Sequence, residues 1–223
     1  MYLANKGIKA ANVPYVPEIE PPKILNDLDG PVIIGLTNTV DRLLELRLNR
    51  LYHLNQKADS PYVNESSIEK GIKQAEQIAE KLKKDFKIEK IISSPLLRAR
   101  QTSQIVNKML KKEIIFIDEI TEWGGIKNWI GNTTFEIKQS KEFEIYINDP
   151  TELNTDESFF DTFKRVDKLY ENNKNVLFVT HQDTIRSFMF YKLESDNFNM
   201  DKPSHCDLQY IEKNNLKKYI NPV

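Results

Sequence analysis

With 223 residues, the chain can bury a hydrophobic core as one large domain or as one domain with an appendage. Its 32 Lys and Arg residues balance 33 Asp and Glu residues, and this net charge of −1 argues against general nucleic-acid binding and against a membrane surface as partner. The single cysteine, Cys206, excludes an internal disulfide framework and a cysteine-based zinc site. Since no apolar run reaches roughly 18 residues and the first residues lack a signal-peptide core, we expect a soluble, cytoplasmic protein.

The N-terminal segment differs from the rest of the chain. Residues 11–31 hold five of the ten prolines and show little hydrophobic periodicity. Because proline fixes φ and lacks an N–H donor, we expect residues 1–30 to form an extended connector on a surface.

Apolar and amphipathic segments alternate from residue 31 onward. Strands are predicted at 31–37, 87–94, 114–118, 175–181 and 207–212, and helices at 40–54, 66–82, after Pro95, around 133–147, at 159–173 and at 183–193. Such alternation predicts an α/β fold, in which a mostly parallel sheet carries helices on both faces. Ligands of such sheets bind beyond the carboxyl ends of the strands, where the pairs Ser93–Ser94 and Thr180–His181 fall.

Three side chains at these strand ends are suited to holding a phosphate. Arg98 and Arg100 begin the helix after Pro95, where a guanidinium can bind two phosphate oxygens beside the helix N–H groups. His181 ends a buried strand, and from there it could stabilise charge that develops in phosphoryl transfer. The alternatives are solvated helix arginines and a hydrogen-bonded core histidine. Arg186 is expected on the surface of its helix.

The other titratable candidates lie outside these segments. Glu122 falls in an irregular Trp-Gly segment, where a carboxyl group with a raised pKa could protonate a leaving oxygen. His53 is expected to pack within a leucine-rich helix or lie on its surface, and His205 is expected in a loop before the last strand. Cys206 is expected to be a small core residue. We predict no metal site and no cofactor.

The segments ISSPLLRARQT (92–102), ESFFDTFKRV (157–166) and VLFVTHQDTIR (176–186) resemble the histidine phosphatase superfamily of phosphoglycerate-mutase-like enzymes. The match spans about residues 67–212. The resemblance implies a three-layer α/β sandwich and transfer of a phosphoryl group through a phosphohistidine. It also implies phosphate binding by Arg98, transition-state stabilisation by His181 and proton donation by Glu122.

The chain departs from this family at its nucleophile. The family opens with a strand that ends in Arg-His-Gly, whose histidine is phosphorylated. The corresponding strand here reads IIGLTNT and places Gly35 and Leu36 where arginine and histidine are expected. Leucine cannot be phosphorylated, so covalent catalysis lacks a visible nucleophile.

A second resemblance covers about residues 1–65. The segments MYLANKGIKAANVPYVPEIEPPKIL, VIIGLTNTVDRLLELRLNRL and ADSPYV resemble the regulatory proteins of pyruvate, phosphate dikinase and phosphoenolpyruvate synthase. That family's phosphate loop precedes the position that matches Met1, so we expect this loop to be missing. We therefore predict a chimera, with residues 1–65 from the regulator family supplying a strand and a helix, and residues 66–223 forming the phosphatase-like domain.

Three hypotheses about function follow. The first is a phosphoric monoester hydrolase family member with an incomplete site, a pseudoenzyme that binds a small phosphorylated molecule. The second is a regulatory or binding protein that contacts a dikinase through residues 1–65. The third is a non-functional gene fusion.

Overall fold

The computed structural model describes residues 32–36, 65–126, 129, 134–198, 203–213 and 215–220. The connector expected at 1–30 and the helix expected around His53 lie outside these residues. In the part that the structure describes, no helix is long and apolar enough to cross a membrane.

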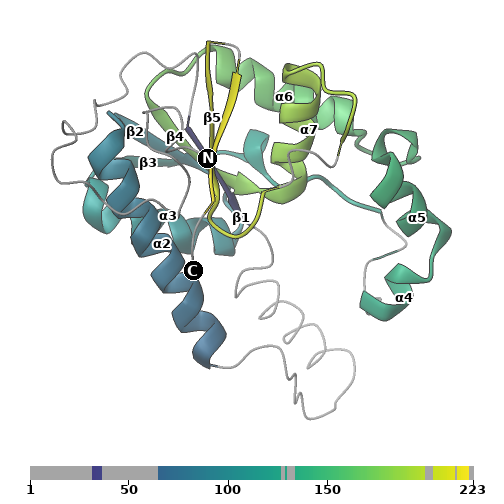
Figure 1. Cartoon of the computed structure of the whole chain (residues 1–223), viewed down its shortest axis with the longest axis horizontal. Coiled ribbons are helices and arrows are strands. Elements are labelled where there is room, and N and C mark those ends of the chain that lie inside the picture. Colours follow the sequence, from purple (N-terminus) through teal and green to yellow (C-terminus); the bar gives the residue numbers. More distant parts are fainter. Residues whose placement is uncertain are drawn as a thin grey trace, which may run out of the picture.

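The described strands form one six-stranded sheet in the order β3-β2-β4-β1-β5-β6 (Figure 1). Their bounds are β1 Val32–Leu36, β2 Lys90–Ser93, β3 Glu113–Phe116, β4 Val176–His181, β5 Leu208–Glu212 and β6 Asn215–Tyr219. The first four strands run parallel to one another, and β5 and β6 form an antiparallel hairpin beside β1. The predicted mostly parallel sheet is confirmed.

Two pairs of helices cover the two faces of the sheet. Helices α2 (Glu65–Asp85) and α3 (Leu97–Leu110) pack on one face, and α6 (Phe159–Glu171) and α7 (Gln182–Lys192) pack on the other. Successive residues of β1 pack on opposite faces of the sheet. Ile34 belongs to the core that α2 and α3 cover, and Ile33 belongs to the core that α6 and α7 cover. A strand buried on both faces needs a continuous apolar run, which explains the composition of residues 31–37. The fold is the expected three-layer α/β sandwich.

Strand β1 lies at the centre of the sheet, between β4 and β5. Its register pairs Ile33 with Phe178 and Leu36 with His181 in the parallel neighbour β4. For residues 32–36, the expectation that this segment joins the same sheet as 88–93 and 176–180 is therefore confirmed.

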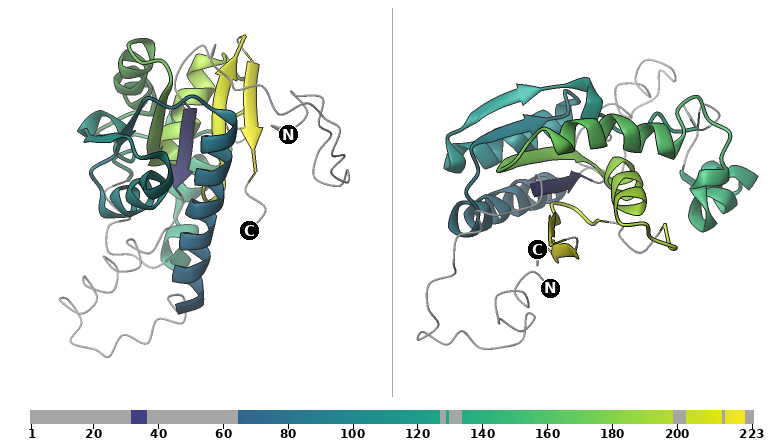
Figure 2. Two further views of the ribbon diagram at one scale, coloured as in Figure 1. Left: turned by 90° about the vertical axis from the view of Figure 1, so that its left-hand side faces the viewer. Right: turned by 90° about the horizontal axis from the view of Figure 1, so that it is seen from above.

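The segment between β3 and α6 is broken into short elements. It contains the 3₁₀ turns η2 (Asp118–Ile120) and η4 (Pro150–Glu152) and the helices α4 (Thr134–Lys138) and α5 (Lys141–Asn148). The single helix predicted around 133–147 is divided at Ser140, whose hydroxyl accepts a hydrogen bond from the N–H of Phe143 and caps α5. Figures 1 and 2 show α4 and α5 at one end of the molecule, beyond α6 and α7.

Candidate active site

The candidate site lies at the carboxyl ends of β2 and β4, which are parallel neighbours. The N–H of Ser94 donates to the carbonyl of Val179 at 3.0 Å, so the pairing continues past the end of β2. As a result the buried Ser94 hydroxyl lies 2.8 Å from Nε2 of the buried His181. The two strand ends that the sequence singled out therefore meet at one point.

Arg98 joins this pair from the first turn of α3. Its Nε–H donates to Nδ1 of His181 at 3.0 Å. Because an arginine N–H can only donate, Nδ1 carries no proton, and the proton of the neutral ring lies on Nε2, which donates to Ser94. Burial lowers the pKa of His181 well below its ordinary value, and the charges of Arg98 and Arg165 lower it further. The imidazole is thus neutral near pH 7.

Glu122 faces the same group from the segment after η2. Its Oε2 lies 3.9 Å from a terminal guanidinium nitrogen of Arg98 and 4.0 Å from Nδ1 of His181. Its Oε1 accepts hydrogen bonds from the N–H of Trp123 at 3.1 Å and from the N–H of Thr184 at 3.3 Å. The side chain of Glu122 is 27% exposed, whereas that of His181 is fully buried, so solvent reaches the group on the side of Glu122.

The carboxyl group of Glu122 has an unusual proton affinity. Burial, and after it the neighbouring carboxylate of Asp183, raise its pKa from 4.5 to about 8, against the opposing charge of Arg98. Near pH 7 most molecules therefore carry a neutral Glu122 that can donate a proton. A carboxyl group that donates a proton near neutral pH requires such a raised pKa.

Arg100 does not join Arg98. It is exposed, and its guanidinium lies 4.9 Å from the ring centroid of Phe116, in cation–π contact. Residues two apart on an α-helix project about 200° apart, so the helix that directs Arg98 inward directs Arg100 to another side. The expectation that Arg98, Arg100 and His181 converge is wrong for Arg100.

The expectation for Arg186 is also wrong. Its side chain is only 1% exposed, and Nη1 donates to Asp183 at 2.6 Å and to the Tyr146 hydroxyl at 2.9 Å. The guanidinium also lies 4.6 Å from the ring centroid of Phe198. A carboxylate and aromatic faces together allow this arginine to be buried beneath α5.

Two remaining candidates lie in the turn before β5. His205 is partly buried, and burial together with the charge of Lys70 lowers its pKa. Cys206 packs in the core that α2 and α3 cover, and burial raises the pKa of its thiol to about 12. Cys206 is therefore the core residue that the sequence predicted. Across the described residues, no group of three or more His, Cys, Asp and Glu side chains is placed to hold a metal ion.

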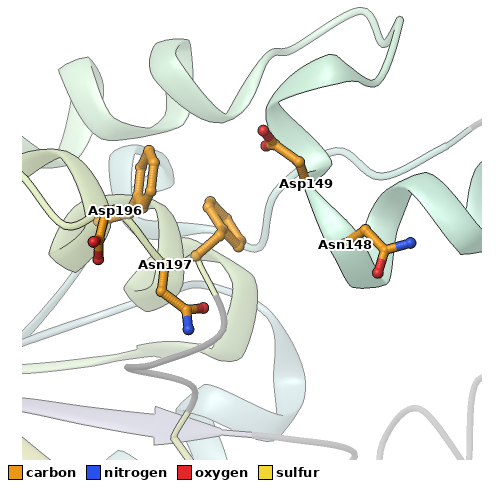
Figure 3. Close-up of a pocket in the computed structure, with 6 residues that line it drawn as sticks. Asn148, Asp149, Asp196 and Asn197 are labelled. Carbon is orange, nitrogen blue, oxygen red and sulfur yellow. The ribbon is translucent and has the colours of Figure 1, made fainter.

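A separate hollow of about 400 Å³ lies at the other end of α7. Its lining residues are Asn148, Asp149, Phe190, Asp196, Asn197 and Phe198. Figure 3 shows the carboxylate of Asp196 and the amide of Asn148 turned to opposite sides of this hollow. None of the predicted site residues lines it, and its polar groups do not converge on one point.

The carboxyl-end cluster was only partly visible in the sequence. Thr184, Asp183 and the pair Glu157–Arg165 contact or influence Glu122 but were not predicted as site residues. The one available signal was the segment 157–166, which already carried the family resemblance.

Comparison with known families bears on the family and the fold. The model of the histidine phosphatase superfamily (branch 1) matches residues 68–218. The chain belongs to this superfamily. Among solved structures, a mycobacterial hydrolase superposes with a TM-score of 0.59 at 15% identity, covering 87% of this chain and 99% of its own. A mycobacterial glucosyl-3-phosphoglycerate phosphatase complexed with VO₃ superposes with a TM-score of 0.56 at 15% identity, covering 87% and 98%. At these identities the likeness concerns the fold.

The N-terminal part matches a different family. The kinase/pyrophosphorylase model matches residues 1–90, so residues 68–90 match both models. A protein of Rhodospirillum rubrum named as a pyruvate, phosphate dikinase regulatory protein is 46% identical over 78 residues, which are 35% of this chain and 28% of that protein. One of Clostridioides difficile is 36% identical over 127 residues, or 57% and 40% of the two chains. The chain thus spans only about a quarter to two fifths of these curated relatives.

Proposed function

We propose that this protein binds the phosphoryl group of a small phosphate ester at Arg98, His181 and Glu122, with little or no turnover. The observation that carries the proposal is the convergence of these three side chains at the carboxyl ends of β2 and β4. We also propose that the protein is located in the cytoplasm.

Each group has a function in anion binding. Arg98 offers charged N–H donors at the first turn of α3, where the N-terminal end of the helix dipole adds partial positive charge. The neutral, buried His181 donates its Nε2–H to Ser94 and accepts at Nδ1 from Arg98, so it orients the guanidinium that faces the anion. Glu122, when protonated, places a neutral donor rather than a like charge beside the anion. Arg98 and Glu122 therefore supply a charged and a neutral donor, and His181 holds Arg98 in place.

The expected lack of turnover rests on residue 36. By resemblance, the phosphorylated histidine of the family belongs near this position, and the residue here is leucine, whose Cα is the register partner of that of His181. Without a nucleophile, binding and electrostatic stabilisation remain, and these alone give only a small part of a covalent enzyme's rate.

Binding of inorganic phosphate and of vanadate, measured by isothermal titration calorimetry at pH 7, tests the site. Replacing Arg98 with alanine is expected to weaken binding by about tenfold or more, because a charge-assisted donor is lost. Arg100→Ala provides the matched control, since it removes an arginine two residues away on the same helix and is expected to change affinity less than about twofold. Equal losses in both variants would show that the anion responds only to net charge.

A second candidate function rests on the N-terminal match. The identity with dikinase regulatory proteins over 78 residues favours contact with a dikinase through residues 1–65. Strand β1 lies inside the sheet, between β4 and β5. We therefore propose that residues 1–65 and residues 66–223 differ in origin, although β1 shares one core with the second segment. Titration of purified pyruvate, phosphate dikinase into the full chain is expected to give saturable binding that Arg98→Ala leaves unchanged. Absence of binding at micromolar concentrations would exclude this contact.

A further inference from the structure

Arg165 and Glu157 hold the backbone on both sides of Glu122. Arg165, on α6, donates through Nη1 to the carbonyl of Glu119 at 2.6 Å and through Nη2 to the carbonyl of Glu122 itself at 3.4 Å. Glu157 accepts from the N–H of Gly124 at 3.1 Å through Oε2. The chain from 119 to 124 is thereby fixed at three points by side chains more than 30 residues away in sequence.

The two clamping side chains also fix each other. Arg165 Nε donates to Oε1 of Glu157 at 2.6 Å, and Nη2 donates to Oε2 at 3.3 Å, so the two planar groups meet through two hydrogen bonds. The backbone carbonyl of Glu157 accepts from the indole N–H of Trp123 at 2.7 Å, and that indole stacks on Phe159 with 4.3 Å between ring centroids. Glu157 lies just before α6, which Ser158 caps through a reciprocal pair with Asp161. The start of α6 therefore forms a rigid support for the segment that carries Glu122.

We propose that Arg165 and Glu157 are positioning residues for Glu122, which keep its carboxyl group in the partly buried place beside Arg98 and His181. This inference rests on the proposed function only for its biological meaning, because the position of the carboxyl group is a property of the free protein. A segment without these contacts would be free to turn Glu122 toward water.

Positioning by Arg165 and a simple charge interaction with Arg165 predict opposite shifts in the pKa of Glu122 when Arg165 is replaced. If Arg165 acts only as a nearby cation, its removal raises the pKa of Glu122, since a cation favours the ionised carboxylate. If Arg165 holds the carboxyl group in its buried place, its removal lowers the pKa toward the ordinary value, since the group becomes hydrated. Arg165→Lys separates the two further, because it keeps the charge and loses the forked donor geometry.

The test is a pH titration of the Glu122 side-chain carboxyl carbon by NMR in the full chain, with the signal assigned by its loss in Glu122→Gln. We expect Arg165→Gln, Arg165→Lys and Glu157→Gln each to lower the midpoint by about one pH unit or more. Lys164→Gln is the matched control, because Lys164 precedes Arg165 on α6 and pairs with Asp161. It is expected to leave the midpoint unchanged.

An unchanged or raised midpoint in folded Arg165→Gln overturns the proposal. If Arg165→Gln loses the native amide NMR pattern, the midpoint measured in Glu157→Gln decides the question, because this change loosens the same clamp from its other side. Anion binding is measured separately. A lowered midpoint in a protein that binds no phosphate supports the clamp and removes the proposed function, whereas phosphate binding with an unmoved midpoint does the reverse.

Discussion

Replacing Leu36 with histidine is expected to produce a phosphohistidine and a measurable hydrolysis of an aryl phosphate, whereas we expect the unmodified protein to show neither. Leu36 is the register partner of His181 on the neighbouring parallel strand. Paired positions of neighbouring strands lie about 4.8 Å apart and direct their side chains to the same face of a sheet. A histidine introduced at position 36 therefore begins beside the group formed by His181, Arg98 and Ser94.

The expected gain is on the order of 10²-fold over the unmodified protein, well below the ~10⁶-fold that a fully assembled nucleophile supplies. By resemblance, the family carries an arginine where this chain has Gly35, so Gly35→Arg added to Leu36→His is expected to increase the gain by providing a second guanidinium. The measurements are steady-state release of nitrophenol and intact mass after brief exposure to substrate. Adding His181→Ala to the Leu36→His variant is expected to abolish both signals.

Leu36→Gln is the control for a polar side chain without a nucleophile, and we expect it to remain inactive. Robust turnover by the unmodified chain that His181→Ala abolishes would falsify the proposal of an impaired enzyme. In that case the Ser94 hydroxyl, which contacts Nε2 of His181, would become the first nucleophile to test, and His205 the second.

The sheet could be predicted because its signals are local. Strands buried on both faces must be continuously apolar, and runs such as 31–37 and 175–181 are short enough to be strands. Their order in the chain, with helices between them, then determines which ends meet. The hairpin strand β6 was missed because Asn215–Tyr219 holds two lysines and few apolar residues, as expected for an edge strand that needs only one protected face.

The site could be predicted only in part, because its remaining contacts are not local. Arg98 and His181 were visible through their places at strand ends. The direction of Arg100 depends on the rotation of α3, which a motif does not specify. The clamp between Arg165 and the carbonyl of Glu119 joins residues 46 positions apart. A buried cation such as Arg186 is likewise not foreseeable until its partners, Asp183 and Tyr146, are brought together by the fold.

Replacing Glu122 with glutamine is expected to stabilise the protein near pH 8 and to leave its stability unchanged below pH 4.5. The pKa of Glu122 is about 8 in the folded protein and ordinarily 4.5. Between these values the folded state retains a proton that the unfolded state has lost. The free energy of unfolding therefore falls as pH rises through this window, and it levels off above pH 8. Glutamine resembles the neutral carboxyl group and does not titrate, so it removes this loss.

Without relaxation of the site, the free energy of unfolding would fall by about 1.4 kcal/mol for each pH unit between the two pKa values. Because the Glu122 side chain is 27% exposed and can relax toward water, we expect only about 2 kcal/mol at pH 8. The measurement is chemical denaturation at pH 4.5, 6, 7 and 8.5. Glu119→Gln, at an exposed position of η2, is the matched control and is expected to give a difference that does not change with pH.

The same substitution should change how anion binding depends on pH. Sulfate keeps its double charge across this range, so a loss of its affinity between pH 7 and 9.5 reports ionisation of the protein. Once Glu122 ionises, a carboxylate lies beside the anion instead of a neutral donor, and we expect sulfate affinity to fall by about tenfold above pH 8. In Glu122→Gln the affinity is expected to stay constant over that interval.

The two measurements constrain one another. Stability reports the proton on Glu122 in the free protein, whereas sulfate affinity reports whether that proton faces the bound anion. A pH-dependent stabilisation with a flat sulfate profile would show that Glu122 is buried and neutral but does not face the ligand, which would remove it as a proton donor. Identical denaturation profiles of both proteins at every pH would show an ordinary carboxylate. Only a fall in both quantities in the unmodified protein, absent from Glu122→Gln, fits a neutral donor beside Arg98 and His181.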